Sequence, residues 1–182
     1  MADPAPVDEV KLLAFVLWAD EDAREGGLAR LAERFGRIDF LGADRPFDCT
    51  GYYRDEMGPA LWRRLVSFER LIPPEGIAAV KHACNEIERE LSGPCGRRVN
   101  LDAGYLDRAK LVLASMKFGS QKIHLGSGVW ADPCGRRQRA GWTWFEWSFP
   151  DLRDGRYDAE LDTVRRRYLA QRRDRLTPRR TG

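Results

Sequence analysis

The longest uninterrupted apolar run of the sequence is Leu12–Ala19, and it restricts the fold more than any other segment. Its eight residues fall short of the roughly 18 that a helix needs to span a bilayer. With Val10 in front, the segment is short and rich in Leu, Val, Phe and Trp, which is typical of a strand buried on both faces. We therefore predict a buried strand over Val10–Ala19 and no membrane partner.

The chain has 182 residues, of which 43% are hydrophobic and 10% aromatic, so it can build one sizeable core. We predict a single domain over residues 10–170. Residues 1–9 contain two prolines and three acidic residues and are expected to form a disordered leader. Residues 171–182 are expected to form a basic, frayed tail.

The apolar run does not resemble a secretory signal, because a single Lys precedes it, acidic residues flank it and no small-residue cleavage site follows. We expect a cytoplasmic protein. The cysteines form no C-x-x-C pair, so the sequence predicts neither a zinc knuckle nor a redox motif. Buried or incidental thiols are the simpler interpretation of all four: Cys49, Cys84, Cys95 and Cys134.

The net charge of +3 conceals a basic C-terminus. Thr163–Gly182 contains eight Arg and one Asp, which leaves the first 162 residues at about −4. Such a segment is suited to RNA or another anionic surface. A solvated helix end followed by a frayed terminus is the commoner meaning of such a run, so RNA binding through the Arg-rich C-terminus is an alternative.

The first half of the sequence predicts alternating strands and helices. After the first strand, Asp20 is suited to cap a helix that runs to Phe35 and stops at Gly36. Arg37–Asp48 is expected to contain a second strand, and the following segment, Phe47–Pro59, has no regular period. A third strand is expected at Leu61–Ile72, and a helix follows Pro73 and Pro74. Its apolar residues recur at three- and four-residue spacing: Ile77, Val80, Cys84, Ile87 and Leu91.

The second half predicts strands joined by turns and one last helix. The expected strands are Arg98–Asp102, Ala109–Met116, Lys122–Trp130 and Trp142–Phe149. The expected turns and loops are Ala103–Tyr105, Phe118–Gln121 and Asp132–Gly141. A helix is expected after Asp154, with an apolar stripe of Tyr157, Leu161, Val164 and Tyr168.

This order of elements predicts an α+β fold. We expect a mainly antiparallel sheet with helices packed on one face, built as a ferredoxin-like β-α-β-β-α-β core plus C-terminal strands and a helix.

Three longer segments and one shorter one carry a family resemblance: FDCTGYYRDEMG, LVSFERLIPPE, VNLDAGYLDRAKLVLAS and WSFPDLR. Over about Val10–Tyr168 the chain resembles a bacterial and archaeal family catalogued only as a domain of unknown function, the one numbered 4416. Some members carry the automatic label of GTP-binding protein. The resemblance therefore implies a nucleotide as one candidate ligand.

The residues that match the family pattern are Phe47, Asp48, Thr50, Tyr52, Tyr53, Glu56, Met57, Gly58, Ser67, Phe68, Glu69, Asn100, Asp102, Gly104, Tyr105, Leu106, Lys110 and Lys117. The chain departs from the pattern at Gly51, Ala103 and Gln121, where the family has an acid, a Pro and a His. A mechanism with that His as general base is not expected here. His124 does not replace it, since an odd shift along a strand turns the side chain to the other face.

Within the matched segments, carboxylates, an amide, tyrosines and lysines form the most informative set. Carboxylate and amide oxygens suit Mg²⁺, and lysines can receive a phosphate. The candidate metal ligands are Asp48, Glu69 and Asp102. The candidate ligand-binding residues are Asp48, Tyr52, Tyr53, Glu56, Glu69, Asn100, Asp102, Tyr105, Lys110 and Lys117. In the alternative, the two Asp cap turns while the tyrosines and lysines lie along a sheet edge.

Known catalytic and nucleotide motifs are missing from the sequence. It contains no G-x-x-x-x-G-K-[ST], and the glycines of Leu125–Trp130 are better explained by a hairpin turn. It contains no G-x-S-x-G, and its two His residues, His82 and His124, are not at metal-ligand spacing.

Three functions from different classes fit these observations. The first is a binding module for a nucleotide or other phosphorylated ligand. The second is a metal-assisted phosphoester hydrolase or transferase, which requires Asp48 and Asp102 to share a cavity. The third is a non-enzymatic RNA- or protein-binding adaptor that uses the Arg-rich C-terminus and the aromatic segment Trp142–Trp147. We place the binding module first, and the sequence does not decide whether the protein is an enzyme.

Overall fold

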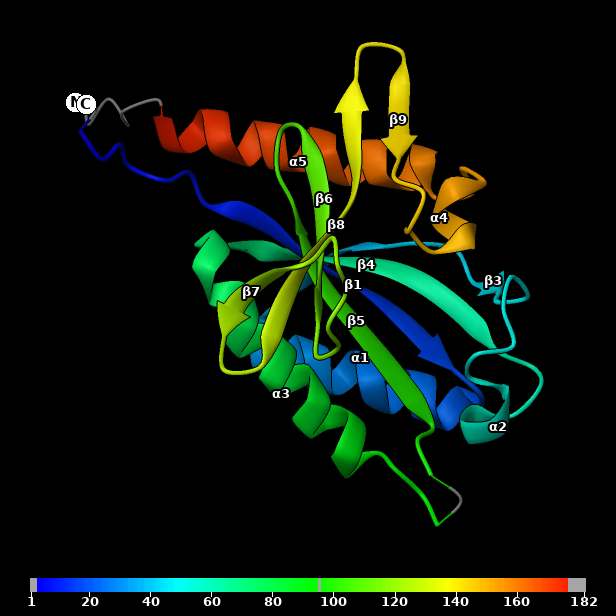
Figure 1. Ribbon diagram of the computed structural model, residues 1–182. Coiled ribbons are helices and arrows are strands. Elements are labelled where there is room, and N and C mark those ends of the chain that lie inside the picture. The colour runs from blue at the N-terminus through cyan, green and yellow to red at the C-terminus, as the bar shows by residue number, and fades with distance from the viewer. Residues whose placement is uncertain (1–2, 95, 177–182) are drawn as a thin grey trace.

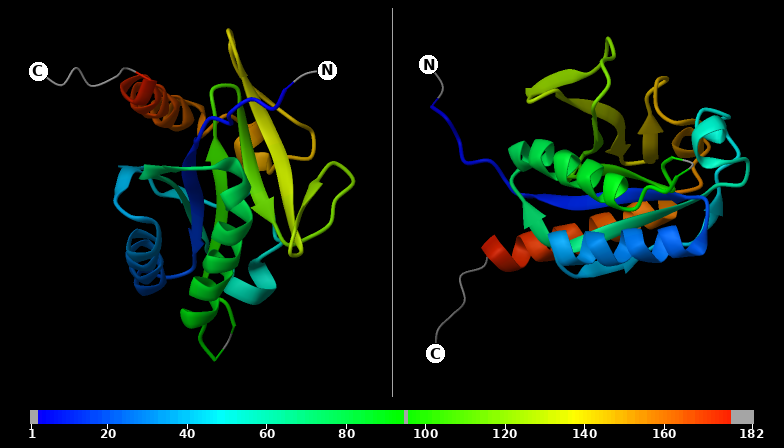
Figure 2. Two further views of the ribbon diagram at one scale, coloured as in Figure 1. Left: turned by 90° about the vertical axis from the view of Figure 1, so that its left-hand side faces the viewer. Right: turned by 90° about the horizontal axis from the view of Figure 1, so that it is seen from below.

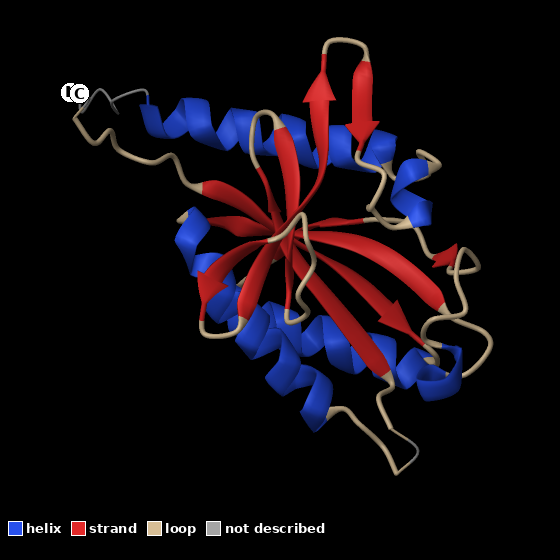
Figure 3. Ribbon diagram, viewed as in Figure 1, coloured by secondary structure: helices blue, strands red, loops and turns tan. Residues whose placement is uncertain are grey.

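The computed structural model describes residues 3–94 and 96–176 (Figure 1). Over these residues the chain has an α+β fold (Figure 3), with nine strands in one mainly antiparallel sheet and five α-helices. The strands are β1 (Val10–Trp18), β2 (Ile38–Leu41), β3 (Arg45–Pro46), β4 (Trp62–Ile72), β5 (Val99–Leu106), β6 (Lys110–Ser115), β7 (Ile123–Gly126), β8 (Val129–Gln138) and β9 (Gly141–Trp144). The helices are α1 (Glu21–Phe35), α2 (Arg54–Met57), α3 (Ile77–Glu90), preceded by a 3₁₀ turn at Pro74–Gly76, α4 (Pro150–Arg153) and α5 (Asp158–Leu176).

The strand predicted from the apolar run is confirmed as β1, which lies inside the sheet and is buried along its whole length. The strand order is β2-β4-β1-β5-β6-β8-β7, with β3 paired to β4 and β9 paired to β8. Side chains alternate between faces along a strand. Those of Leu12, Ala14 and Val16 join one core with α1 and α3, while Leu13 and Phe15 join a second core with α5.

The expectation that all helices pack on one face is wrong. α1 and α3 cover one face, and α5 covers the opposite one (Figure 2). The cause is the predicted stripe of α5, whose Leu161, Val164 and Tyr168 are fully buried. A strand that is apolar on both faces needs a layer on each side, so the first segment of the sequence already required this second layer.

Both long helices of the first core begin and end as expected. The Asp20 carboxylate accepts a hydrogen bond from the Ala23 N–H at 2.9 Å and so caps α1. Gly36 ends that helix with a φ of 91°, a value that favours glycine. The predicted apolar stripe of α3, from Ile77 to Leu91, packs into the same core.

The predicted turn at Ala103–Tyr105 is wrong, because β5 runs without interruption from Val99 to Leu106. A Cβ on Gly104 would lie 2.5 Å from the Val112 carbonyl oxygen and 2.6 Å from Leu113 Cδ2. Gly104 is therefore needed for the close approach of β6. The turn comes later, where the Asp107 N–H donates to the Lys110 carbonyl.

The C-terminal strands are also divided differently from the prediction. The expected strand Lys122–Trp130 is wrong, because the hairpin turn predicted at Leu125–Trp130 is present inside it. Ser127 and Gly128 have φ values of 51° and 72°, as a primed hairpin turn requires. β8 then occupies most of the expected loop Asp132–Gly141, and the last expected strand is reduced to β9.

Two residues of β9 hold the β8–β9 hairpin against α5. The Trp142 and Trp144 rings stack at 5.4 Å, and their indole N–H groups donate to Asp162 and Asp158. The indole N–H of a Trp that packs against other elements usually needs a hydrogen-bond acceptor.

The described termini of the chain meet on α5. The Tyr168 hydroxyl donates to the Glu9 carbonyl oxygen, and Arg172 pairs with Asp8. Residues 171–176 continue α5, while 177–182, which belong to the predicted tail, lie outside the described residues. No helix in the described part of the chain is long and apolar enough to cross a membrane.

Three of the four cysteines fall within the described ranges, and they are free thiols. Cys84 and Cys134 are buried, as the simpler interpretation predicted, and burial raises the pKa of Cys84 to about 12. Cys95 lies outside the described residues.

The close approach at Gly104 predicts a stability difference between two glycine variants. Gly104→Ala is expected to lower the free energy of unfolding by about 1–3 kcal/mol, because the added methyl group overlaps β6. Gly51→Ala is the matched control, since its Cβ would meet nothing within 4 Å, and it should change that free energy by less than about 0.5 kcal/mol. Urea unfolding of both variants gives the comparison. Equal stability of the two would contradict the close approach.

Candidate functional site

The sheet opens between β5 and β6, and this gap forms the candidate site. The two strands pair only from Gly104↔Leu113 to Leu106↔Leu111, close to the turn that joins them. Beyond this point β5 continues beside β1, while Ala114 and Ser115 of β6 continue beside β8. The two halves of the sheet therefore separate, and α3 runs alongside β5 at the opening (Figure 1).

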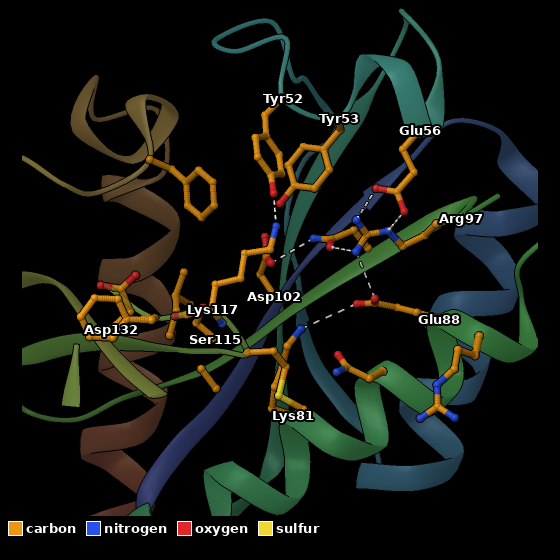
Figure 4. Close-up of a pocket in the computed structure, with 18 of the residues that line it drawn as sticks. Tyr52, Tyr53, Glu56, Lys81, Glu88, Arg97, Asp102, Ser115, Lys117 and Asp132 are labelled. Atoms are coloured by element: carbon orange, nitrogen blue, oxygen red, sulfur yellow. Dashed lines mark hydrogen bonds and ion pairs between the residues drawn. The ribbon is translucent and has the colours of Figure 1, made fainter. Parts of the chain in front are cut away.

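A cavity of about 690 Å³ occupies the gap (Figure 4). Its volume is in the range of pockets that bind small molecules. The polar residues that line it are Tyr52, Tyr53, Glu56, Lys81, Asn85, Glu88, Arg89, Ser92, Arg97, Asn100, Asp102, Ser115, Lys117, Lys122 and Asp132. They come from the α2 segment, from α3, from β5 and the chain before it, and from β6 to β8.

Where β6 no longer pairs with β5, two charged residues of α3 bond to the main chain of β5 instead. Glu88 Oε1 accepts a hydrogen bond from the Leu101 N–H at 2.7 Å, and Lys81 Nζ donates to the Leu101 carbonyl oxygen at 2.9 Å. Both side chains are buried, and their charged ends lie 3.8 Å apart. Burial raises the pKa of Glu88 above its ordinary value. The exposed edge of β5 is thus satisfied by side chains where a strand would normally pair.

Arg97 connects this pair to the α2 segment. Its guanidinium donates to Asn100 at 2.6 Å, to Glu88 at 3.2 Å and to Glu56 at 2.6 Å. Asn100 in turn donates to Asp102 at 2.9 Å. Because Glu56 lies on α2, this chain of contacts fastens the α2 segment over the cavity.

The network ends at a fully buried arginine. Arg63 donates to Asp102 at 2.9 Å and to Asp151 at 2.7 Å. Its guanidinium lies over the rings of Phe15 and Phe149, at 4.5 and 4.8 Å from their centroids. Burial alone would lower the pKa of Arg63, but the two carboxylates outweigh it and raise that pKa. Arg63 therefore fixes Asp102 in place and joins β4, β5 and α4.

The other side of the cavity is cationic and lies at the end of β6. Lys122 Nζ donates to the Ser115 hydroxyl at 2.9 Å and lies 3.4 Å from the Asp132 carboxylate. Lys117 contacts the Tyr52 hydroxyl and lies 4.5 Å from the centre of that ring. Among the described residues, Lys117 has no carboxylate partner.

The structure brings together six of the residues predicted from the sequence. Tyr52, Tyr53, Glu56, Asn100, Asp102 and Lys117 all line the cavity. The other four lie elsewhere. Asp48 lines a separate, smaller cavity and pairs with Arg156, while Glu69 is exposed and pairs with Arg37. Tyr105 and Lys110 lie at the closed end of the gap, beyond the lining residues.

The predicted metal site is wrong. Asp48, Glu69 and Asp102 do not converge, and the described residues contain no group of three or more His, Cys, Asp or Glu that could hold a metal ion. Each of the three carboxylates instead has an arginine partner, namely Arg156, Arg37 and Arg63. Carboxylates that look equivalent in the sequence can contact different neighbours when they lie on separate segments of the fold.

The part of the site that comes from α3, from the chain between α3 and β5, and from the end of β6 onward was not predicted from the sequence: Lys81, Asn85, Glu88, Arg89, Ser92, Arg97, Ser115, Lys122 and Asp132. A signal for the α3 residues was present. Lys81, Asn85, Glu88 and Ser92 recur at spacings of three and four, so they form a polar stripe beside the apolar one. No comparable signal marks Lys122, because its neighbours depend on how β7 and β8 fold back.

Comparison with known proteins gives one match. The family model described as Domain of unknown function (DUF4416) matches residues 8–168, which is most of the chain. The chain belongs to this family. Neither a curated protein nor a solved structure matches the chain. The segments that carry the DUF4416 resemblance supply both α2 and β5, and residues of both elements line the cavity.

The capping role of Glu88 predicts a specific loss of stability in this DUF4416 protein. Glu88→Ala leaves the buried Leu101 N–H without a partner and should lower the free energy of unfolding by about 2–3 kcal/mol. Glu88→Gln keeps an acceptor and should lose less. Glu86→Ala on the exposed side of α3 is the control, with an expected change below about 0.5 kcal/mol. Thermal and urea unfolding measure all three, and a Glu88→Ala variant as stable as Glu86→Ala would contradict the cap.

Proposed function

We propose that the protein binds a small phosphorylated ligand, with a nucleotide as the leading candidate, in the cavity between β5 and β6. The observation that carries this proposal is the position of Lys117. Its ammonium group lies at the cavity with no carboxylate partner among the described residues and contacts the Tyr52 hydroxyl, while Lys122 and Ser115 line the same cavity. Ammonium and hydroxyl groups that line one cavity are suited to phosphate oxygens.

The distribution of charge in the cavity supports an anionic ligand. Its lining has five cationic side chains and four carboxylates, so cations are in slight excess. The carboxylates are occupied: Glu56 and Glu88 by Arg97, Asp102 by Arg63, and Asp132 by Lys122. Among the described residues, Lys117 and Arg89 have no carboxylate partner and are left to meet a charge from outside.

Aromatic side chains near Lys117 support a ligand that also has a ring. The Tyr52 and Tyr53 rings meet edge to face at 4.9 Å on one wall, and Phe118 and Phe149 line the cavity as well. Base-to-aromatic contacts are a common source of affinity for nucleotides. This arrangement agrees with the nucleotide label of some family members, although the chain lacks the usual glycine-rich phosphate loop.

The alternatives from the sequence are less well supported. A phosphoester hydrolase that uses Asp48 and Asp102 together requires a shared cavity, and the two residues line different ones. RNA binding through the Arg-rich C-terminus stays a prediction, since residues 177–182 lie outside the described part of the chain. The binding module therefore remains the preferred function.

We also propose that the first half of the fold is a ferredoxin-like core. Its elements follow the order β1-α1-β2-β4-α3-β5, and the corresponding strands lie in the order β2-β4-β1-β5 with antiparallel pairing throughout. Both helices lie on one face of these strands. This interleaved order supports the β-α-β-β-α-β core expected from the sequence.

A cytoplasmic location is proposed on the state of the thiols. The three cysteines within the described ranges are free, and two of them are buried in the core. Unpaired buried thiols are typical of proteins from reducing compartments.

The role of Lys117 is tested with two lysine variants at opposite ends of β6. Lys117→Met should weaken binding of a phosphorylated ligand about 10- to 100-fold, which corresponds to the loss of one charged hydrogen bond. Lys110→Met is the control, because Lys110 lies outside the cavity and pairs with Asp107, and it should change affinity less than about threefold.

The ligand panel for this test contains ribonucleoside mono- and triphosphates with and without Mg²⁺, ribose 5-phosphate, inorganic phosphate and pyrophosphate. Thermal shift finds the binders, and calorimetry gives their dissociation constants. Failure of every compound to bind the unmodified protein would overturn the proposal, and so would equal effects of the two lysine variants.

A further inference from the structure

Met116 directly follows Ser115, the last residue of β6, and lies in a bend beside the open edge of that strand. The Asp107 N–H donates to the Lys110 carbonyl, which makes these two residues a hydrogen-bonded pair. In an antiparallel ladder the N–H and C=O of alternate residues point to the same neighbouring strand. Counting from Lys110, the strand residues that face β5 are Val112 and Ala114, and Met116 is the next position in this alternation.

Pairing with β5 stops before Met116 is reached. Tyr105↔Val112 and Gly104↔Leu113 are paired, and no pair beyond them is formed between β5 and β6. On the β5 side, the N–H and C=O of Leu101 face the gap, and Glu88 and Lys81 occupy them. On the β6 side, neither the N–H nor the C=O of Met116 has a hydrogen-bond partner among the described residues.

The composition of the cavity wall shows that this edge faces the ligand space. Five consecutive residues, Leu113 to Lys117, line the cavity. Side chains of successive strand residues point to opposite faces, so they could not all reach one cavity. The cavity therefore borders the edge of the strand, where the main chain is presented.

We propose that the Met116 N–H and C=O bind the hydrogen-bonding edge of a nucleobase, which makes the phosphorylated ligand a nucleotide. This inference rests on the proposed function and specifies its ligand class. The N–H and C=O of one residue offer a donor and an acceptor next to each other, and nucleobases carry adjacent donors and acceptors in the plane of the ring. A sugar phosphate or pyrophosphate has no such planar edge.

The neighbours of Met116 suit the rest of a nucleotide. Lys117 follows it directly, and Lys122 contacts the Ser115 hydroxyl that precedes it, so phosphate-binding groups lie next to the base edge. The cavity is closed at one end, where β5 and β6 pair at Gly104↔Leu113. Its volume of about 690 Å³ fits a single small molecule.

A comparison of ligands tests the base contact in the unmodified full chain. Calorimetric titration uses the four common ribonucleotides, ribose 5-phosphate and the four nucleosides. At least one nucleotide is expected to bind about tenfold or more tightly than ribose 5-phosphate, because the base adds hydrogen bonds and ring contacts. Equal binding of ribose 5-phosphate and every nucleotide would overturn the base contact and leave the proposed function intact. Nucleosides that bind as tightly as nucleotides would overturn the proposed function instead, and no binding at all would overturn both.

Two variants at one position separate main chain from side chain. Met116→Pro removes the N–H and should weaken nucleotide binding about tenfold while ribose 5-phosphate binding is kept. Met116→Leu keeps the main chain and should change nucleotide affinity less than about threefold. A Met116→Pro protein that melts normally and binds nucleotide like the unmodified chain would contradict the inference. If that variant fails to fold, the ligand comparison still decides the question.

Discussion

The hydrogen bonds from Lys81 and Glu88 to the main chain of Leu101 are the interaction on which the site depends. A sheet that opens in its middle exposes N–H and C=O groups, and each group left unpaired when buried costs about 1–3 kcal/mol. Helix side chains that satisfy one of the two edges remove this cost without closing the gap. The strands β5 and β6 can then separate beyond Gly104, and the space between them becomes the cavity.

Buried charged groups join the elements on the β5 side of the opening. Arg63 joins β4 to β5 and α4 through Asp102 and Asp151, and it lies against aromatic rings. Lys11 plays a similar part on the α5 side, where it contacts Asp39 at 2.5 Å and Gln171 at 2.8 Å. Burial is the largest influence on the pKa of Lys11 and lowers it. Removing one partner of such a pair is costly because it leaves a buried charge uncompensated.

Much of the fold could be predicted from local patterns. The apolar run of β1 and the stripes of α3 and α5 identify these elements, since burial of one face imposes its period on the sequence. Gly104 shows the limit of such patterns, because a glycine is equally compatible with a turn and with the close approach of another strand. That ambiguity caused the turn to be placed too early.

The candidate site was predictable only in part, for a different reason. Residues of β5 and the α2 segment were found because they lie in the segments that carry the family resemblance. Glu69 was wrongly added, because its distance from β5 depends on the order of the strands in the sheet. Lys81 and Glu88 were missed because charged residues on a helix usually face water. Their function becomes clear only from the fold, in which Leu101 has no strand partner on the side of the gap.

Residue-resolved amide hydrogen exchange, measured by NMR with and without a saturating nucleotide, tests the open edge most directly. The Leu101 amide should exchange slowly in both states, because Glu88 accepts its hydrogen bond. The Met116 amide should exchange rapidly without ligand and slow down by at least about tenfold when the nucleotide is bound. A Met116 amide already as protected as Leu101 in the free protein, or unchanged at saturation, would contradict a ligand site at this edge.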